Sequence, residues 1–246
     1  MNMSKPLRMA MWSGPRNLST ALMRSFGNRA DCFVTDEPLY AHYLKVTGLA
    51  HPGADEVIAT HENDWRRAVA WLTGPVPEGK AVWYQKHMTH HLLPMIERDW
   101  LAQLTHCFLL RDPREVLPSL DAKFARPSFA ETGMAQQWEI FEFVQRTTGA
   151  VPPVIDAADL LHDPQAVLTL LCERLGLDFQ ASMLHWPAGR RATDGVWAKH
   201  WYHSVEKSTG FGAERGGGTK LAPHLQPLLE QCLPYYEKLH AHRLRT

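Results

Sequence analysis

The chain has 246 residues, of which 45% are hydrophobic and 21% are charged, and these values are typical of a folded globular protein. Its 26 lysines and arginines balance 26 acidic residues, so no net positive charge is available to hold a nucleic-acid backbone. A local positive site for one small phosphate-bearing ligand is compatible with this neutrality. We therefore expect one domain over residues 1–246 that takes a small-molecule partner and no nucleic acid.

The start of the chain and its cysteines bear on where the protein resides. The stretch of residues 1–7 is short and polar. No apolar run reaches the length of a signal peptide or a membrane span. We expect a cytoplasmic protein without membrane contact, whose oligomeric state, a homodimer included, stays open. The cysteines lack the close pairs of zinc sites, which favours reduced and buried thiols at Cys32, Cys107, Cys172 and Cys232.

Strand and helix signals alternate along most of the chain. Compact apolar segments predict strands at 8–12, 32–35, 81–85, 105–110 and 154–155. The helical spacing of apolar residues, with turn and capping residues at the ends, predicts helices at 18–28, 63–72, 163–175 and 223–239. This alternation favours the α/β class, with a parallel sheet and helices packed on both of its faces.

A loop between the first predicted strand and helix has the composition of an anion site. It combines Gly14 for a tight backbone turn, the cation Arg16, and the hydroxyls of Ser19 and Thr20. Backbone N–H groups at a helix start attract phosphate oxygens, and a guanidinium binds them with paired donors. Ordinary helix capping would use similar residues. The pattern nevertheless favours a phosphate site made of Gly14, Pro15, Arg16, Asn17, Leu18, Ser19 and Thr20.

This loop lacks the Gly-Lys-Ser/Thr ending of P-loop triphosphatases, so a P-loop nucleotide kinase or hydrolase is the less favoured alternative. The run from Pro15 to Thr20 instead resembles the 5'-phosphosulfate loop of sulfotransferases that use 3'-phosphoadenosine 5'-phosphosulfate (PAPS), above all the bacterial sulfotransferase-like P-loop proteins. That pattern has a proline, a basic residue, two small residues and two hydroxyls. Here Arg16 replaces the usual lysine, and Leu18 replaces the usual glycine.

A second motif follows the strand predicted at 105–110. Arg111 ends this strand, and Ser119 lies eight positions later in a helix. In sulfotransferases an arginine and a serine with this spacing hold the 3'-phosphate of the donor, so the resemblance implies that role for both residues. Taken alone, Arg111 next to Asp112 would be read as a surface ion pair. Two motifs in the family's order, each at a strand-to-helix junction, carry the assignment.

The resemblance implies a three-layer P-loop NTPase-like fold, with a central parallel sheet flanked by helices. It also implies transfer of a sulfuryl group from PAPS to a hydroxyl or amine, with 3'-phosphoadenosine 5'-phosphate as the product and no metal requirement. The sequence does not identify the acceptor. A catalytically inactive nucleotide-binding protein is the second alternative.

Sulfuryl transfer needs a base for the acceptor's proton. Glu37 follows the second predicted strand, where carbohydrate-type and bacterial sulfotransferases resemble this chain in having a glutamate. Partial burial would raise the pKa of this carboxyl toward working pH. The alternative is that Asp36 and Glu37 only cap a helix that begins at Pro38. His87 is a competing base.

The reaction also needs cations near the oxygen that leaves sulfur. Arg16 is the first candidate and Lys86, at the end of the third predicted strand, is the second. Sulfotransferases often have a Lys-x-His motif after that strand, whereas here Lys86 and His87 are adjacent. His87, His90 and His91 lack a carboxylate at ligand spacing, so we expect a solvated helix start and no metal site.

The segment 189–220 has glycines, arginines and aromatic residues with weak periodicity. It predicts a lid or substrate-side loop, and composition alone equally allows a flexible surface connection. Its basic, glycine-containing part loosely resembles the sulfotransferase segment that folds over the adenine and the 3'-phosphate, which makes Arg215 a candidate for neutralising that phosphate. Trp197, Trp201 and Tyr202 are candidates for the acceptor pocket or for the core.

Overall fold

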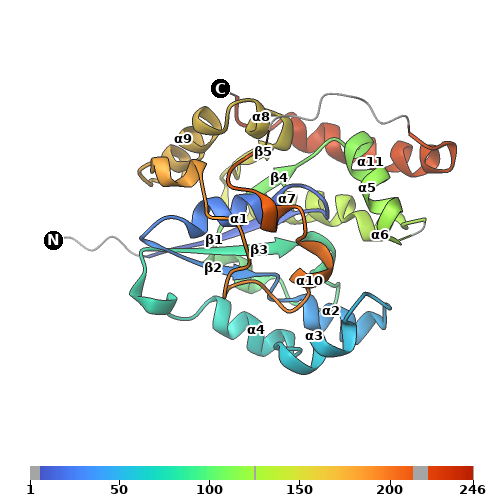
Figure 1. Cartoon of the computed structure of the whole chain (residues 1–246), viewed down its shortest axis with the longest axis horizontal. Coiled ribbons are helices and arrows are strands. Elements are labelled where there is room, and N and C mark those ends of the chain that lie inside the picture. The colour runs from blue at the N-terminus through green and yellow to red at the C-terminus, as the bar shows by residue number, and fades with distance from the viewer. Residues whose placement is uncertain (1–5, 125, 213–220, 246) are drawn as a thin grey trace.

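A five-stranded parallel sheet runs through the protein in the strand order β2-β3-β1-β4-β5 (Figure 1). The computed structural model describes residues 6–124, 126–212 and 221–245. The predicted α/β class is confirmed. The strands are β1 (Leu7–Ser13), β2 (Cys32–Asp36), β3 (Val82–Met88), β4 (Thr105–Leu110) and β5 (Val154–Asp156).

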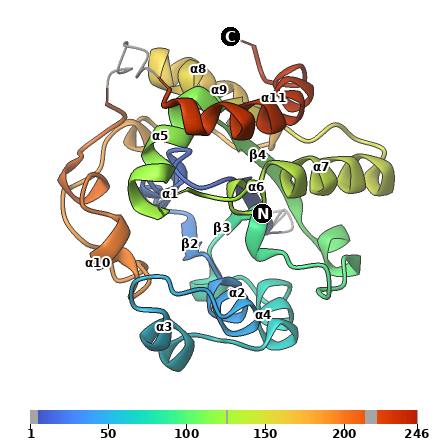
Figure 2. The ribbon, with the colours of Figure 1, turned by 90° about the vertical axis from the view of Figure 1, so that its right-hand side faces the viewer.

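Helices connect the strands and cover both faces of the sheet. They are α1 (Ser19–Gly27), α2 (Tyr40–Thr47), α3 (Ala54–Thr60), α4 (Trp65–Leu72), α5 (Pro113–Phe124), α6 (Phe129–Thr132), α7 (Met134–Thr148), α8 (Ala157–His162), α9 (Pro164–Arg174), α10 (Ala198–Trp201) and α11 (Gln226–His240). Short 3-10 turns lie at Pro77–Gly79, Thr89–His91, Asp99–Gln103, Ala181–Leu184, Val205–Lys207 and Pro223–Leu225. In Figure 2, α10 and α7 lie on opposite sides of the molecule.

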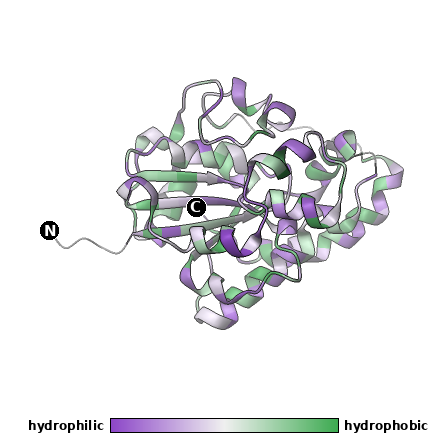
Figure 3. Cartoon of the chain, turned by 90° about the horizontal axis from the view of Figure 1, so that it is seen from below, coloured by the Kyte–Doolittle hydropathy of each residue, from purple (hydrophilic) through white to green (hydrophobic). Residues whose placement is uncertain are grey.

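The central strand β1 shows why the sheet needs a helix layer on each face. Met9 and Met11 belong to one buried cluster, which contains residues of α1, α8 and α9. Ala10 and Trp12 belong to a second cluster, with residues of α4, α7 and α11. Successive side chains of a strand point to opposite faces, so a strand without polar alternation requires cover on both. Figure 3 shows helices with both hydrophobic and hydrophilic residues, as this arrangement requires.

Two predicted helix starts differ from the structure. No helix begins at Pro38, because Glu37 has a left-handed backbone (φ 40°) and the chain turns before α2 begins at Tyr40. The capping interpretation of Asp36 and Glu37 is therefore wrong, since Leu39 occupies the N-cap position of α2. The last helix starts at Gln226 after a 3-10 turn, and its second residue, Pro227, suits a helix start because it has no N–H to bond.

The register of the sheet brings several chain segments to one edge. Asp36 pairs with Lys86 across β2 and β3, and Ser13 pairs with Met88 and Leu109 in the strands on either side of β1. All of these residues lie at or near the carboxyl ends of parallel strands. The loops that follow them therefore meet, which is where open α/β sheets bind ligands.

None of the helices in the described ranges has the length and apolarity that a bilayer span requires. All four cysteines are unpaired and buried, as the sequence predicts.

Gly133 joins α6 to α7 at a point where there is no space for a side chain. Its φ is 70°, and an added Cβ would lie 2.3 Å from Oγ1 of the fully buried Thr89. Gly149, at the other end of α7, has a φ of 71°, and a Cβ added there would have nothing within 4 Å. We predict that Gly133→Ala lowers the free energy of unfolding by about 1–3 kcal/mol more than Gly149→Ala in urea titrations. Equal losses in the two variants would show that backbone strain alone acts at Gly133.

Candidate functional site

A cavity of about 500 Å³ lies at the edge where the strands end. Its wall combines the loop after β1, the ends of β3 and β4, and the segment around α10. Ten of the candidate residues predicted from sequence line it together: Pro15, Arg16, Asn17, Leu18, Ser19, Thr20, Glu37, Lys86, Arg111 and Ser119.

The predicted phosphate loop, residues 14–20, has a strained backbone before α1. Arg16 (φ 64°) and Leu18 (φ 65°) both adopt left-handed conformations, which non-glycine residues rarely do. At Leu18, the position where sulfotransferases usually have glycine, glycine would adopt this backbone without strain. Leu18 is the N-cap of α1, and its side chain has no acceptor with which to cap the helix. The first turn of α1 therefore offers its N–H groups to the cavity, since Ser19 and Thr20 line it.

The two sequence motifs meet at Arg16. Its Nε donates a hydrogen bond to Ser119 Oγ at 2.9 Å, and its carbonyl oxygen accepts one from Arg111 Nη1 at 3.2 Å. The Nε of Arg111 also donates to Glu115 Oε2 at 2.8 Å, one turn along α5. The strand-end arginine and the helix serine thus lie against the phosphate loop, although about a hundred residues separate the motifs.

The positive charge of Arg16 has no carboxylate partner within ion-pair distance in the described part of the chain. Burial lowers the pKa of Arg16, and the charge of Arg111 lowers it further. Two neighbouring guanidinium groups repel each other, and an anion between them would relieve that repulsion. This pair of cations, with the start of α1, fits a phosphate or sulfate group.

Gly14 and Asn17 hold the loop against the neighbouring parts of the fold. Gly14 does not line the cavity, and a Cβ there would lie 2.7 Å from the carbonyl oxygen of Thr132. Asn17 is buried, and its Nδ2 donates to the carbonyl oxygen of Leu109 at 3.3 Å. Its Oδ1 has no partner among the described residues. Gly14 is therefore placed for close packing, while Asn17 ties the loop to β4.

Glu37 and Lys86 form the floor of the cavity, and Asp36 lies behind them. The Nζ of Lys86 lies 2.5 Å from Glu37 Oε1 and 2.9 Å from Asp36 Oδ1, and all three side chains are largely buried. The parallel pairing of Asp36 with Lys86 places these groups together. Two carboxylates thus share one ammonium group.

The surroundings of this ion pair shift the pKa values of both Glu37 and Lys86. Burial raises the pKa of Glu37, the charge of Asp36 raises it further, and these effects outweigh the opposing charge of Lys86. Burial opposes the charge of Lys86, but Asp36 and Glu37 outweigh it and hold its pKa well above its usual value. Lys86 is therefore charged at neutral pH, and Glu37 is a stronger base than an exposed glutamate.

Two of the three histidines are buried, so the expectation of a solvated helix start is wrong for His87 and His91. His87 is the sixth residue of β3 and is 1% exposed, with its ring stacked 4.4 Å from that of Trp12. Burial lowers its pKa to about 3, and it is not part of the cavity wall. His90 and His91 do line the cavity, and burial lowers their pKa values as well. These rings are neutral at physiological pH.

The segment before the last helix is packed over the described range 189–212. Trp197 and Tyr202 are 2% and 4% exposed and pack with residues of α2 and α3. Trp201 and Tyr202 line the cavity. Arg215 lies outside the described residues. The sequence indicates no role for Asp36 beyond capping. It marks Tyr202 only as a pocket or core candidate and gives no signal of its polar partners, because they are far away in the chain.

Within the described ranges, no group of three or more histidine, cysteine or acidic side chains is arranged to hold a metal ion.

Comparison with known proteins adds relatives to this geometry. Branched-chain-amino-acid aminotransferase-like protein 2 of Arabidopsis thaliana is 39% identical over 231 residues, which cover 94% of this chain and 41% of that protein. The related protein 1 of the same plant is 39% identical over 243 residues, covering 98% of this chain and 43% of its own length. The chain thus spans less than half of these relatives.

Solved structures share the fold at lower identity. The sulfotransferase domain of the Synechococcus PCC 7002 olefin synthase has a TM-score of 0.58 at 20% identity, with 98% of each chain covered. A sulfotransferase from Alicyclobacillus acidocaldarius has a TM-score of 0.52 at 11% identity, again with 98% of each chain covered. The family model described as the sulfotransferase domain matches residues 7–243. The chain therefore belongs to the sulfotransferase domain family.

Proposed function

We propose that this chain moves a sulfuryl group from PAPS to a hydroxyl or amine of a small acceptor and releases 3'-phosphoadenosine 5'-phosphate. The observation that carries the proposal is the contact of Arg16 with both Ser119 and Arg111 in one cavity. In the family pattern these motifs bind the two phosphate ends of one nucleotide. The meeting of two cationic groups beside the start of α1 supports a doubly phosphorylated ligand.

Some of the candidate residues would bind the donor, and others would take part in the reaction. The loop from Pro15 to Thr20, with Gly14 packed behind it, would hold the 5'-phosphosulfate, and Arg111 with Ser119 would hold the 3'-phosphate. In the reaction, the acceptor atom bonds to sulfur as the bond between sulfur and the phosphate oxygen breaks, and its electron pair stays on that oxygen. Arg16 would stabilise this oxygen, and Glu37 would take the acceptor's proton.

Glu37 fits the base role better than His87. It lines the cavity, and its carboxylate is buried enough for a raised pKa. His87 lies behind the wall, against Trp12, and its lowered pKa makes it a weak base. The proposal therefore assigns the proton to Glu37.

Calorimetry with 3'-phosphoadenosine 5'-phosphate and with ATP, each with and without magnesium, tests the donor. We expect the bisphosphate to bind more tightly and without dependence on magnesium. Preference for ATP plus magnesium would reject the proposal in favour of a kinase or hydrolase. Binding of the bisphosphate without any turnover of PAPS would instead indicate an inactive nucleotide-binding protein.

The role of Arg111 gives a quantitative prediction. Arg111→Ala should weaken binding of 3'-phosphoadenosine 5'-phosphate by about 1.5–3 kcal/mol, because a charge-assisted hydrogen bond is lost. Adenosine 5'-phosphosulfate, which has no 3'-phosphate, should show a much smaller loss. Arg114→Ala is the matched control, since Arg114 is three residues away in the first turn of α5, is 56% exposed and pairs only with Asp112 within the described residues. Unchanged nucleotide binding in Arg111→Ala would remove this residue from the donor site.

Glu37→Gln tests the base. We expect turnover to fall by at least about 100-fold while nucleotide affinity is retained, because the proton acceptor is lost but the phosphate contacts remain. Release of sulfate from PAPS, with water as the acceptor, provides the rate. The wild-type rate should fall as pH drops through the raised pKa of Glu37, and this acid limb should be absent in Glu37→Gln. Glu139→Gln, at a largely exposed glutamate, serves as the control. A preserved acid limb in Glu37→Gln would identify a different base.

A further inference from the structure

Lys86 has no free N–H bond with which to contact a ligand. Its ammonium group has three, and they point to Glu37 Oε1, Asp36 Oδ1 and the hydroxyl of Tyr202, at 2.5, 2.9 and 2.8 Å. Its side chain is 1% exposed. Contact with a leaving oxygen would require one of these buried bonds to break. The structure therefore does not favour Lys86 as the second cation of the reaction.

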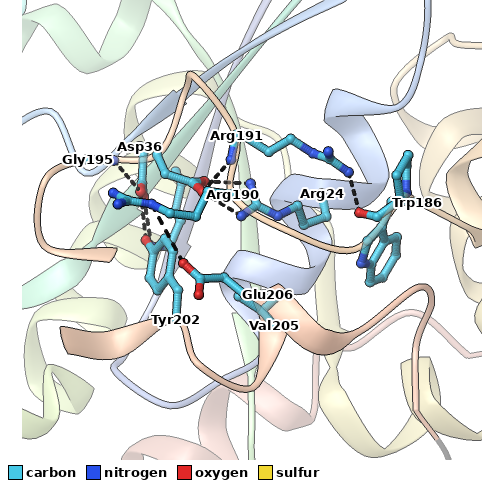
Figure 4. Close-up of polar contacts among 12 residues, drawn as sticks. Arg24, Asp36, Trp186, Arg190, Arg191, Gly195, Tyr202, Val205 and Glu206 are labelled. Atoms are coloured by element: carbon cyan, nitrogen blue, oxygen red, sulfur yellow. Dashed lines mark hydrogen bonds and ion pairs between the residues drawn. The ribbon is translucent and has the colours of Figure 1, made fainter. Parts of the chain in front are cut away.

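Asp36 connects this lysine to the segment around α10. Its Oδ2 accepts a hydrogen bond from the Tyr202 hydroxyl at 2.7 Å and a longer one from the backbone N–H of Gly195 at 3.4 Å (Figure 4). Asp36 is 7% exposed and does not line the cavity. It cannot touch a bound ligand directly, so any effect on the reaction must pass through Lys86 and Glu37.

Tyr202 completes the network from a distant part of the sequence. Its hydroxyl donates to Asp36 and accepts from Lys86 and from Nε1 of Trp197, the latter at 3.3 Å. Every hydrogen-bonding position of the hydroxyl is thus in use. The tyrosine and the aspartate hold Lys86 in one orientation, and Lys86 in turn holds the carboxylate of Glu37.

A second buried contact holds the same segment against α1, the helix that follows the predicted phosphate loop. Both terminal nitrogens of Arg24, in α1, donate to the carboxylate of Asp194, at 2.5 and 2.7 Å, and both side chains are at most 2% exposed. Arg24 lies beside the 190–195 stretch in Figure 4, on the opposite side from Asp36 and Tyr202. The segment is therefore anchored to α1 through Asp194 and to β2 through Gly195 and Tyr202.

We propose that Asp36 and Tyr202 are positioning residues for the reaction proposed above. They saturate Lys86, so that it orients the Glu37 carboxylate in the cavity and leaves the stabilisation of the leaving oxygen to Arg16. This inference rests on the proposed function, because it assigns Glu37 as the base. It gives the segment around α10 a part in catalysis without contact to the reacting atoms.

Glu37 is surrounded by groups from five parts of the fold. Lys86 of β3 and Asp36 of β2 are the charged ones, and the Nδ1 of His91 lies 3.9 Å from Glu37 Oε2. Tyr40 and Tyr202 also face it, and their pKa values are raised by burial with a contribution from the charge of Glu37. The negative charge of Asp36 raises the pKa of Glu37. Its removal in Asp36→Asn should therefore lower that pKa and move the acid limb of turnover to lower pH.

A double-mutant cycle between Tyr202→Phe and Glu37→Gln tests the positioning role. Alone, Tyr202→Phe should reduce sulfate release from PAPS by about 10- to 100-fold, because a displaced base loses its aligned geometry. The affinity for 3'-phosphoadenosine 5'-phosphate should not change. In the Glu37→Gln background, Tyr202→Phe should cause no further loss, since it acts through Glu37. Additive losses, or weakened nucleotide binding, would overturn the proposal.

A second tyrosine–aspartate pair elsewhere in the protein provides matched controls. The hydroxyl of Tyr236 donates to Asp156 Oδ2 at 3.0 Å, and neither residue lines the cavity. Tyr236→Phe removes the same type of contact and should leave turnover unchanged. Asp156→Asn should leave the acid limb in place, because Asp156 does not line the cavity. Asparagine also keeps the helix cap that Asp156 forms with Ala158, so the fold should be retained. A shift of the acid limb in Asp156→Asn equal to that in Asp36→Asn would reduce the effect to general destabilisation.

Titration without turnover separates this inference from the proposed function. With isotope-labelled glutamate, the carboxyl of Glu37 can be followed by NMR in the ligand-free protein and assigned by its loss in Glu37→Gln. Asp36→Asn should lower its pKa whether or not PAPS is the donor. An unchanged pKa would reject the role of Asp36, even if PAPS is turned over. A lowered pKa in a protein that does not use PAPS would keep the contact and reject the proposed reaction.

Discussion

The ammonium group of Lys86 is the buried charge on which the floor of the cavity depends. A charge removed from water is stable only when it is paired and its hydrogen bonds are satisfied. Here the parallel register of β2 and β3 supplies Asp36, the turn after β2 supplies Glu37, and the segment around α10 supplies Tyr202. Loss of any of these contacts would leave a buried polar group unpaired. The orientation of the cavity floor and the packing of the 189–208 segment are therefore linked.

The wall of the cavity combines a strained backbone with the positive charge of Arg16. Arg16, Leu18 and Glu37 all have left-handed backbones and all line the cavity. Such conformations cost about 1–3 kcal/mol each and persist where the surrounding structure holds them. Asn17, buried between Arg16 and Leu18, is bonded to β4 and so secures this loop. This contact of Asn17 helps to offset the strain of a backbone conformation in which the Arg16 side chain reaches Ser119.

Comparison with known proteins shows the family and the fold of the chain. Residues 7–243 match the sulfotransferase domain, and solved sulfotransferases superpose over nearly the whole chain despite identities of 11–20%. Different sequences can build the same parallel sheet because its core requires only apolar residues of suitable volume. The acceptor, in contrast, is set by the shape of loops around the cavity. The side chains of His91, Tyr40 and Trp201 form an aromatic part of the cavity wall.

The sequence alone determined the elements whose signals are local. Buried strands read as apolar runs, and the phosphate loop and the Arg111–Ser119 spacing lie within short stretches, so both motifs and the parallel α/β class were predictable. The helix α7 was missed, because polar and aromatic residues interrupt its apolar spacing. The start of α2 was misplaced because the left-handed turn at Glu37 has no glycine to mark it.

Only the tertiary structure decided which side chains share the cavity. His87 follows Lys86 directly, yet the alternation of β3 turns it to the opposite face, against Trp12. Tyr202 lies 116 positions from Lys86, and no local pattern predicts their contact. Burial and long-range contact depend on how strands pair and segments pack. These are properties of the folded chain as a whole, whereas a sequence motif reports only its near neighbours.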